Sequence, residues 1–285
     1  MNNIKILDGA IGSELILRNQ KLPPHIWSAD TNLTNPNLLL DIYREYIEAG
    51  ANYITTNTFR TTPRAYKKTG LSYSVANKIA EKSMQSAIKI AKKASNESVK
   101  VLGSIAPLED CYSPNLFPGV NIAKSEFSII VKWFKEGGID GYLLETMNNI
   151  PETKLCLEIV REYSLPVWVS FNLKNSYLLQ SGERLKDAIK MTTGFDVECI
   201  LLNCNPLNRT KDAMKILSDN CSIWGIYPNL GIGDPSPDGI ITDYHSDDQF
   251  LDLCKNAIDL GASVLGGCCG TSPRHIKLLR DNFLI

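Results

Sequence analysis

The sequence lacks a large net charge, a long apolar run and a glycine-rich phosphate loop, and each absence argues against a class of protein. Its 285 residues carry 30 Lys and Arg against 31 Asp and Glu, with no local basic run, unlike a nucleic-acid binder. No apolar stretch approaches the ~20 residues of a membrane-spanning helix. The early segment Asp8-Gly9-Ala10-Ile11-Gly12 is not the GxGxxG motif of dinucleotide-binding sheets. We therefore expect neither a nucleic-acid partner nor a membrane.

The cysteine content is the next feature that bears on location. Hydrophobic residues make up 44% and charged residues 21%, as in soluble globular proteins, and no apolar run of signal-peptide length precedes Asp8. Eight cysteines could form disulfides, but a chain of this length buries enough surface without them. We predict a cytoplasmic protein with reduced thiols. Five cysteines stand singly in helix-like or strand-like sequence and are expected to be small buried residues: Cys111, Cys156, Cys199, Cys221 and Cys254.

Short apolar segments alternate with amphipathic segments along the chain. The apolar ones are nearly continuous, as strands buried on both faces require: Ile4–Leu7, Tyr53–Thr56, Val99–Ile105, Gly141–Glu145, Val167–Leu173, Cys199–Cys204, Ser222–Tyr227 and Ser263–Gly267. The amphipathic ones predict helices: Asn37–Ala49, Ser74–Ala94, Ser125–Glu136, Glu152–Tyr163, Arg184–Thr193, Thr210–Ser218, Asp247–Leu260 and Pro273–Phe283. Eight such pairs favour an α/β fold, a single (β/α)8 TIM-type barrel over residues 1–285, above a doubly wound open sheet.

Active sites of such barrels lie at the carboxyl ends of the strands. Cys204 ends the sixth predicted strand, and Cys268 and Cys269 follow the eighth. Three thiolates could hold Zn²⁺ with one position open, the arrangement of a catalytic site. A vicinal disulfide between Cys268 and Cys269, or plain burial of these residues, is an alternative at this point. The neighbouring Gly266, Gly267 and Gly270 suit the irregular backbone that two consecutive ligands need.

Another candidate feature is the turn-rich loop Gly231–Tyr244, which follows the seventh predicted strand. In a barrel it would overhang the active-site face, so we expect either a lid or a solvated loop.

Several motifs in order resemble one family. LDGAIGSEL, WSADTNLTNP, TTNTF, LLET, NC and GGCCGT together resemble the homocysteine S-methyltransferase family from Leu7 to His275. The family usually has Gly before its NC pair, where this chain has Leu202. The resemblance implies a zinc-dependent (β/α)8 barrel that methylates the thiol of homocysteine to give methionine, with Cys204, Cys268 and Cys269 as the zinc ligands.

The resemblance also implies how the substrates are held. Asp8 and Glu145 would bind the ammonium group of homocysteine, although a helix cap and a salt bridge are their structural alternatives. The backbone N–H groups of Gly9 and Ala10 suit its carboxylate. Two aromatic residues, Trp27 and Phe59, would line the side of a cationic methyl donor, or serve only in packing. The three histidines, His25, His245 and His275, are expected to be surface or capping groups.

The identity of the methyl donor stays open at this stage. The IWSA segment resembles enzymes that use S-methylmethionine or S-adenosylmethionine, whereas GGCCGT resembles the homocysteine module of cobalamin-dependent methionine synthase. We favour the sulfonium donor over a corrinoid partner protein, and over betaine. A zinc- or thiol-binding protein without turnover, or a thiol–disulfide enzyme, is an alternative of another class. The latter lacks the CxxC spacing of that chemistry.

Overall fold

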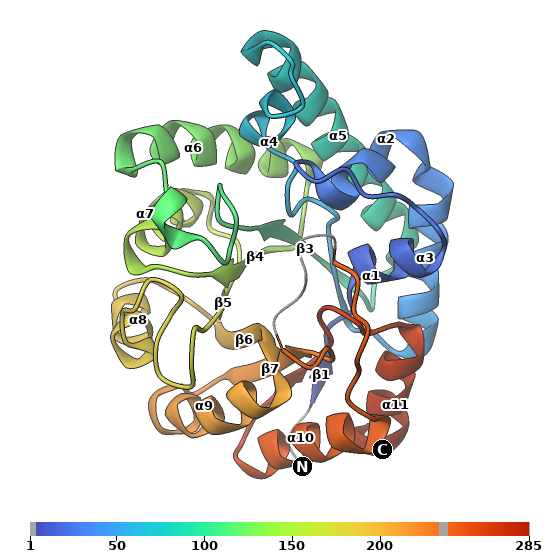
Figure 1. Cartoon of the computed structure of the whole chain (residues 1–285), viewed down its shortest axis with the longest axis vertical. Coiled ribbons are helices and arrows are strands. Elements are labelled where there is room, and N and C mark those ends of the chain that lie inside the picture. The colour runs from blue at the N-terminus through green and yellow to red at the C-terminus, as the bar shows by residue number, and fades with distance from the viewer. Residues whose placement is uncertain (1–3, 234–238, 285) are drawn as a thin grey trace.

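Eight parallel strands form the centre of the molecule in the computed structural model, which describes residues 4–233 and 239–284 (Figure 1). Each strand pairs with its neighbour in the order β1-β8-β7-β6-β5-β4-β3-β2, and a bridge between Leu7 and Tyr53 joins β1 to β2. The strands are β1 (Lys5–Ile6), β2 (Tyr53–Thr55), β3 (Lys100–Ile105), β4 (Gly141–Met147), β5 (Val167–Phe171), β6 (Cys199–Pro206), β7 (Trp224–Asn229) and β8 (Val264–Leu265). The sheet is therefore a barrel, and the predicted (β/α)8 fold is confirmed.

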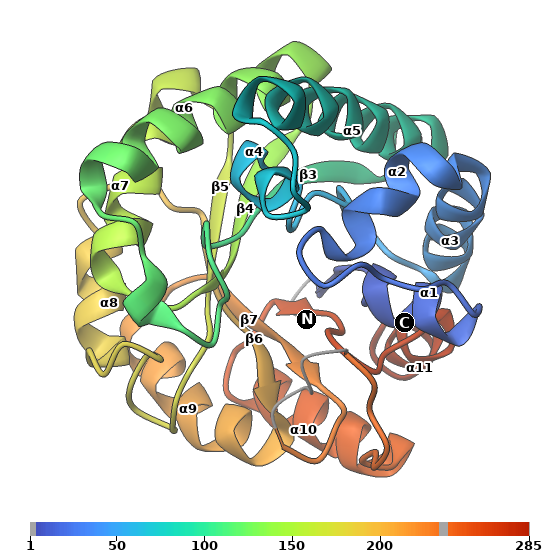
Figure 2. The ribbon, with the colours of Figure 1, turned by 45° about the horizontal axis from the view of Figure 1, so that its top comes forward.

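Helices form a ring around the strands (Figure 2). The ring is made by α3 (Pro36–Ala49), α5 (Tyr73–Ala94), α6 (Val120–Gly137), α7 (Ile150–Val160), α8 (Leu185–Thr192), α9 (Leu207–Asn220), α10 (Asp247–Asp259) and α11 (Pro273–Phe283). Proline stands in the first turn of α3, α7 and α11, where its fixed φ suits a helix and its missing N–H costs no bond. No described helix has the length and apolar character needed to cross a bilayer.

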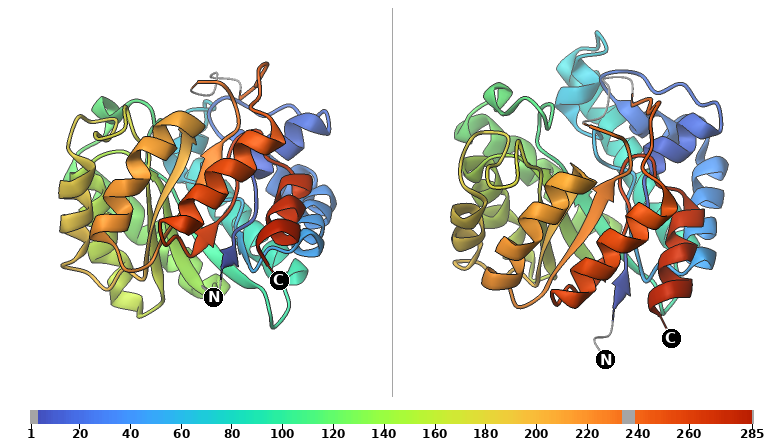
Figure 3. Two further views of the ribbon diagram at one scale, coloured as in Figure 1. Left: turned by 90° about the horizontal axis from the view of Figure 1, so that it is seen from below. Right: turned by 60° about the horizontal axis from the view of Figure 1, so that its bottom comes forward.

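Short extra elements decorate the end of the barrel where the strands exit. They are α1 (Ile11–Leu17), α2 (Thr31–Thr34), α4 (Pro63–Lys67) and the 3₁₀ turns η1 (Trp27–Asp30) and η2 (Pro114–Leu116). A third 3₁₀ turn, η3 (Arg161–Tyr163), continues α7 at the opposite end, before β5 begins. Figure 3 views the barrel from the side, with β1 starting at the lower end and the loop after β7 at the upper end. The sequence analysis did not predict these elements, because segments of three to seven residues are too short to display a periodicity.

Two strands carry an irregularity near their exits. The β4–β5 register shifts between Leu144 and Met147, and the β6–β7 register shifts between Asn203 and Pro206. Within these shifts, Thr146 and Cys204 adopt left-handed φ values of 53° and 54°, which are rare for residues other than glycine. Bulges of this kind re-aim side chains next to active sites. The two bulges therefore direct side chains at the ends of β4 and β6 toward the mouth of the barrel.

The isolated cysteines and the histidines follow their predictions in most cases. Four of the five cysteines are buried, but Cys221 is only half-buried, because it lies at the C-cap where α9 ends. His275 is a capping group: its Nδ1 accepts the backbone N–H of Ser272, the N-cap of α11, at 3.1 Å. Its imidazole is buried rather than at the surface, and His25 is exposed.

A buried polar network fixes the segment that contains Trp27. The side chain of Asn57, just after β2, donates to the carbonyl of Ser28 at 2.8 Å and to Oδ1 of Asn32 at 2.9 Å. It also accepts from the hydroxyl of Ser28 at 2.5 Å, and Asn32 in turn donates to Ser83 on α5. The network explains physically why the WSADTN and TTNTF segments belong together.

Replacing Asn57 by Ala should lower the free energy of unfolding by about 2–3 kcal/mol, because buried donors and acceptors lose their partners. Urea denaturation of the variant measures this effect. Asn220→Ala, at the exposed end of α9, is the matched control and should change stability by less than about 0.5 kcal/mol. Equal stability of the two variants would show that the network does not hold the segment.

Candidate active site

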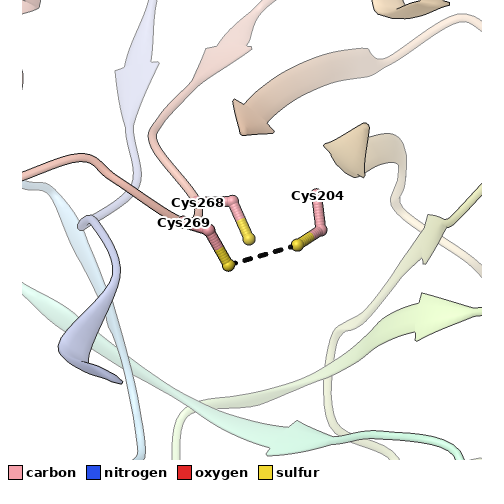
Figure 4. A group of neighbouring side chains, drawn as sticks. All are labelled: Cys204, Cys268 and Cys269. Carbon is pink, nitrogen blue, oxygen red and sulfur yellow. Dashed lines mark hydrogen bonds between the residues drawn. The ribbon is translucent and has the colours of Figure 1, made fainter. Parts of the chain in front are cut away.

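Three cysteine side chains meet at the carboxyl end of the barrel (Figure 4). The sulfur atoms of Cys204, Cys268 and Cys269 all lie within 4.8 Å of one another, and those of Cys204 and Cys269 are 3.4 Å apart. All three are free thiols, so the vicinal disulfide is not formed, and Cys268 and Cys269 are only half-buried. Three convergent soft ligands form a group that could hold a metal ion.

Hydrogen bonds from neighbouring strands position the Cys268–Cys269 loop. The N–H of Cys268 donates to the carbonyl of Pro228 at 2.9 Å, and the carbonyl of Cys269 accepts from Leu230 at 2.9 Å. The N–H of Gly270 donates to the hydroxyl of Ser13 at 2.9 Å, and Gly270 has a left-handed φ of 81° that turns the chain directly after the two cysteines. The loop is thus tied to the β7 exit and to the start of α1.

The third cysteine is positioned by the bulge in β6 and by two polar neighbours. The hydroxyl of Tyr112 lies 3.4 Å from the sulfur of Cys204, and Asn172 donates to the carbonyl of Cys204 at 3.3 Å. Hydrogen bonds from the thiols of Cys268 and Cys269 hold the pKa of Cys204 well below its ordinary value. Burial, followed by the nearby charge of Cys204, raises the pKa of Tyr112, which therefore stays a hydrogen-bond donor to the sulfur.

Asn203 connects the β4 and β5 exits to the thiols. Its Oδ1 accepts from the N–H of Thr146 at 2.9 Å and from the hydroxyl of Ser170 at 2.7 Å. Its Nδ2 points to the sulfur of Cys268 at 4.0 Å. Since Thr146 is the left-handed residue after Glu145, Asn203 stabilises the backbone that presents this acid.

Two carboxylates face the same cavity as the thiols. Asp8 is 2% exposed and accepts from the N–H of Thr55 at 2.7 Å, and Glu145 accepts from the hydroxyl of Ser104. Neither acid forms an ion pair with another described residue, and Asp8 does not cap α1, whose N-cap is Ala10. Burial raises the pKa of both groups, that of Glu145 to about 7. The salt-bridge and helix-cap alternatives are thus not observed, and the two acids lack a cationic partner in the described chain.

All nine residues that the sequence analysis singled out line one cavity of about 670 Å³. Its wall includes Gly9 and Ala10, although the N–H of Ala10 already donates to the hydroxyl of Thr271 at 3.3 Å.

Trp27 is left-handed at φ 52°, and its indole fills the space that a Cβ on Gly239 would need. Gly239 also lines the cavity, so the far part of the Gly231–Tyr244 loop reaches its mouth. Residues 234–238 of that loop lie outside the described residues, and its role as a lid stays a prediction.

Other residues of the site were missed by the sequence analysis. Thr55 and Ser104 hold the two acids, and Tyr112 contacts Cys204. Arg60 and Asp110 line the cavity as a second pair of charged groups, with Arg60 Nη2 3.2 Å from Asp110 Oδ1. Thr55 and Ser104 stand at or near strand ends, which was an available signal. Tyr112, Arg60 and Asp110 lie in irregular loops and gave none.

Comparison with known proteins agrees with this geometry. The family model described as homocysteine S-methyltransferase matches residues 5–283. The chain is 27% identical to homocysteine S-methyltransferase of Escherichia coli (strain K12), over 98% of this chain and 94% of that protein. It is 25% identical to selenocysteine Se-methyltransferase of Brassica oleracea var. italica, over 98% of this chain and 88% of that protein.

Solved structures give the same result. The metallated form of the homocysteine methyltransferase MmuM from Escherichia coli matches with a TM-score of 0.83 and 26% identity, over 98% of this chain and 96% of that one. Its oxidized form matches with a TM-score of 0.84 over the same shares. The fold and the site thus define a methyltransferase built on a TIM-type barrel. The chain belongs to the homocysteine S-methyltransferase family.

The raised pKa of Glu145 predicts a pH dependence of stability in chelator-treated protein. Between its ordinary value of 4.5 and about 7, the folded state keeps a proton that the unfolded state releases, so ionisation of Glu145 destabilises the fold as the pH rises. Glu145→Gln removes this contribution. The variant should therefore gain stability relative to the parent by roughly 1–3 kcal/mol between pH 4.5 and pH 8. Thermal unfolding at several pH values measures the difference, and a constant difference would contradict the prediction.

Proposed function

We propose that residues 1–285 form one homocysteine-binding (β/α)8 domain that transfers a methyl group from a sulfonium donor to the thiol of L-homocysteine, giving methionine. The observation that carries this proposal is the meeting, in one cavity, of three thiols with two acids that have no cationic partner among the described residues. A metal store or a disulfide enzyme has no use for the two acids. A site for an α-amino acid with a thiol needs both kinds of group, because the acids bind the ammonium and the thiol cluster binds the sulfur.

The donor set fits Zn²⁺. Three cysteine sulfurs are soft ligands, and thiolates about 2.3 Å from a tetrahedral zinc ion lie roughly 3.8 Å apart, close to the spacing in this cluster. Cys204, Cys268 and Cys269 would hold the ion. When bound, zinc would lower the pKa of a thiol that takes its fourth coordination position, so that the acceptor sulfur is a thiolate near neutral pH.

The chain's own residues bind and orient the acceptor. Asp8 and Glu145 hold the ammonium group of homocysteine, and each acid is fixed by a neighbour, Thr55 or Ser104. The N–H groups of Gly9 and Ala10 hold the carboxylate, with the Ala10 donor exchanging its long bond to Thr271. The hydroxyl of Tyr112 holds the sulfur of Cys204 in place.

On the donor side, the new bond forms between the homocysteine sulfur and the methyl carbon, while the carbon–sulfur bond of the donor breaks. The departing sulfur keeps the electron pair and leaves as a neutral sulfide. Trp27 and Phe59 line this side of the cavity, and aromatic faces attract a sulfonium cation. A corrinoid protein and betaine are the alternative donors that the assays below separate from a sulfonium donor. Selenocysteine is the alternative acceptor.

Cys269→Ala should lose both bound zinc and methyl transfer while the barrel stays folded, because the two remaining thiols are too few ligands to retain the zinc ion. Metal analysis, circular dichroism and turnover with homocysteine and S-methylmethionine check the three parts. Cys221→Ala, at a half-buried cysteine that caps the end of α9 and is not part of the cluster, is the control and should keep both properties. Full activity in the Cys269 variant would defeat the assignment.

The identity of the donor is tested by supplying homocysteine with one donor at a time. We expect methionine from S-methylmethionine or S-adenosylmethionine, and none from betaine or methylcobalamin, which differ in charge and size from a sulfonium amino acid. Mass spectrometry of a labelled methyl group follows the transfer. Turnover with betaine or methylcobalamin alone would replace the sulfonium proposal by that donor.

A further inference from the structure

The cavity holds four charged side chains besides the thiols, and they form two pairs. Asp8 and Glu145 are the inner pair, with Asp8 2% exposed. Arg60 and Asp110 are the outer pair, with side chains 27% and 39% exposed. Arg60 is the only cationic side chain among the described residues that line the cavity. The mouth of the site therefore carries one positive and one negative charge. The proposed binding of homocysteine uses the inner pair and involves neither of these two charges.

The outer pair has unused hydrogen-bonding capacity. In the described part of the chain, the guanidinium of Arg60 makes one hydrogen bond, from Nη2 to Asp110 at 3.2 Å, and lies 5.9 Å from the ring centre of Phe59. Its other N–H groups are left for a ligand. The second oxygen of Asp110 accepts from the hydroxyl of Ser113 at 2.8 Å, which orients the carboxylate. A guanidinium with a free edge is a common partner for a carboxylate.

The outer pair is also separate from the inner one. Among the described residues, Arg60 forms an ion pair with Asp110 at 3.2 Å and none with Asp8 or Glu145. Burial raises the pKa of Cys111, in the loop beside Arg60, and the charge of Arg60 offsets only part of this rise. A volume of about 670 Å³ lies in the range that holds drug-sized ligands, and it has room for a second amino acid beside homocysteine.

We propose that Arg60 and Asp110 form a subsite for the α-amino-acid end of the methyl donor, with Arg60 binding its carboxylate and Asp110 its ammonium. This inference rests on the proposed function and narrows its donor to a sulfonium α-amino acid. Such a zwitterion complements both members of the pair at once. Phe59, next to Arg60 in sequence, lines the same cavity and offers an aromatic face to the sulfonium group.

Two-substrate kinetics test the subsite. Arg60→Gln should raise the KM for S-methylmethionine about tenfold or more and leave the KM for homocysteine unchanged, because a charge-assisted bond to the donor is lost. Asp110→Asn should also raise the donor KM. Titration calorimetry with S-methylmethionine, in the absence of homocysteine, should show the same loss of affinity.

A donor without the ammonium group separates the two roles. With 3-(dimethylsulfonio)propionate, which has a sulfonium and a carboxylate only, Arg60→Gln should still raise the KM and Asp110→Asn should have no effect. Arg64→Gln is the matched control: Arg64 joins the same two loops through Glu109 at 3.0 Å but does not line the cavity among the described residues. It should leave the KM for both substrates unchanged.

The outcomes distinguish the subsite from the proposed function. Absence of transfer from any sulfonium donor in the parent enzyme would overturn the proposed function itself. Normal transfer combined with an Arg60→Gln effect on homocysteine alone, or on neither substrate, would overturn the subsite. An equal rise of the donor KM in Arg64→Gln would also overturn it, because the pair would then only hold the loops together.

Discussion

The arrangement of the site depends on one constraint: sulfur atoms separated by 65 positions along the chain must meet within 4.8 Å. A parallel barrel supplies most of the solution, because every strand exits at the same end and β6, β7 and β8 are consecutive neighbours. The remainder comes from local backbone geometry. Cys204 adopts a left-handed conformation inside a bulge, and Gly270 turns the chain just after Cys268 and Cys269. Hydrogen bonds that the loop donates to Pro228 and Ser13 and accepts from Leu230 then hold it in place.

The two acids are governed by the opposing effects of burial and hydrogen bonding on their charged forms. Burial opposes the charged form of Asp8 and Glu145, and the hydrogen bonds from Thr55 and Ser104 only partly offset this opposition. Such a pair is unfavourable in isolation and favourable with a cation between its members. The described cavity wall has its one cationic side chain, Arg60, in the outer pair instead. The two acids therefore have no cationic partner among the described residues, and this supports the proposal that a substrate ammonium binds there.

Much of this could be predicted from the sequence. The barrel followed from the alternation of apolar and amphipathic segments, and the approach of Cys204 to Cys268 and Cys269 followed from their places at strand ends. The left-handed residues Thr146 and Cys204 could not be predicted, because neither residue type favours that conformation. Tyr112, Arg60 and Asp110 were missed for another reason: they lie in irregular loops, whose course depends on tertiary contacts and not on a repeating pattern. Periodicity predicts what regular elements bury, and the outer wall of this site is not made of regular elements.

The unpaired inner acids have an evolutionary consequence. In a descendant that no longer transferred methyl groups, replacing Asp8 or Glu145 by a neutral residue would make the barrel more stable, so selection for stability alone would remove them. Under the proposed function, both carboxylates should therefore be retained only where the ammonium group of a substrate is still bound.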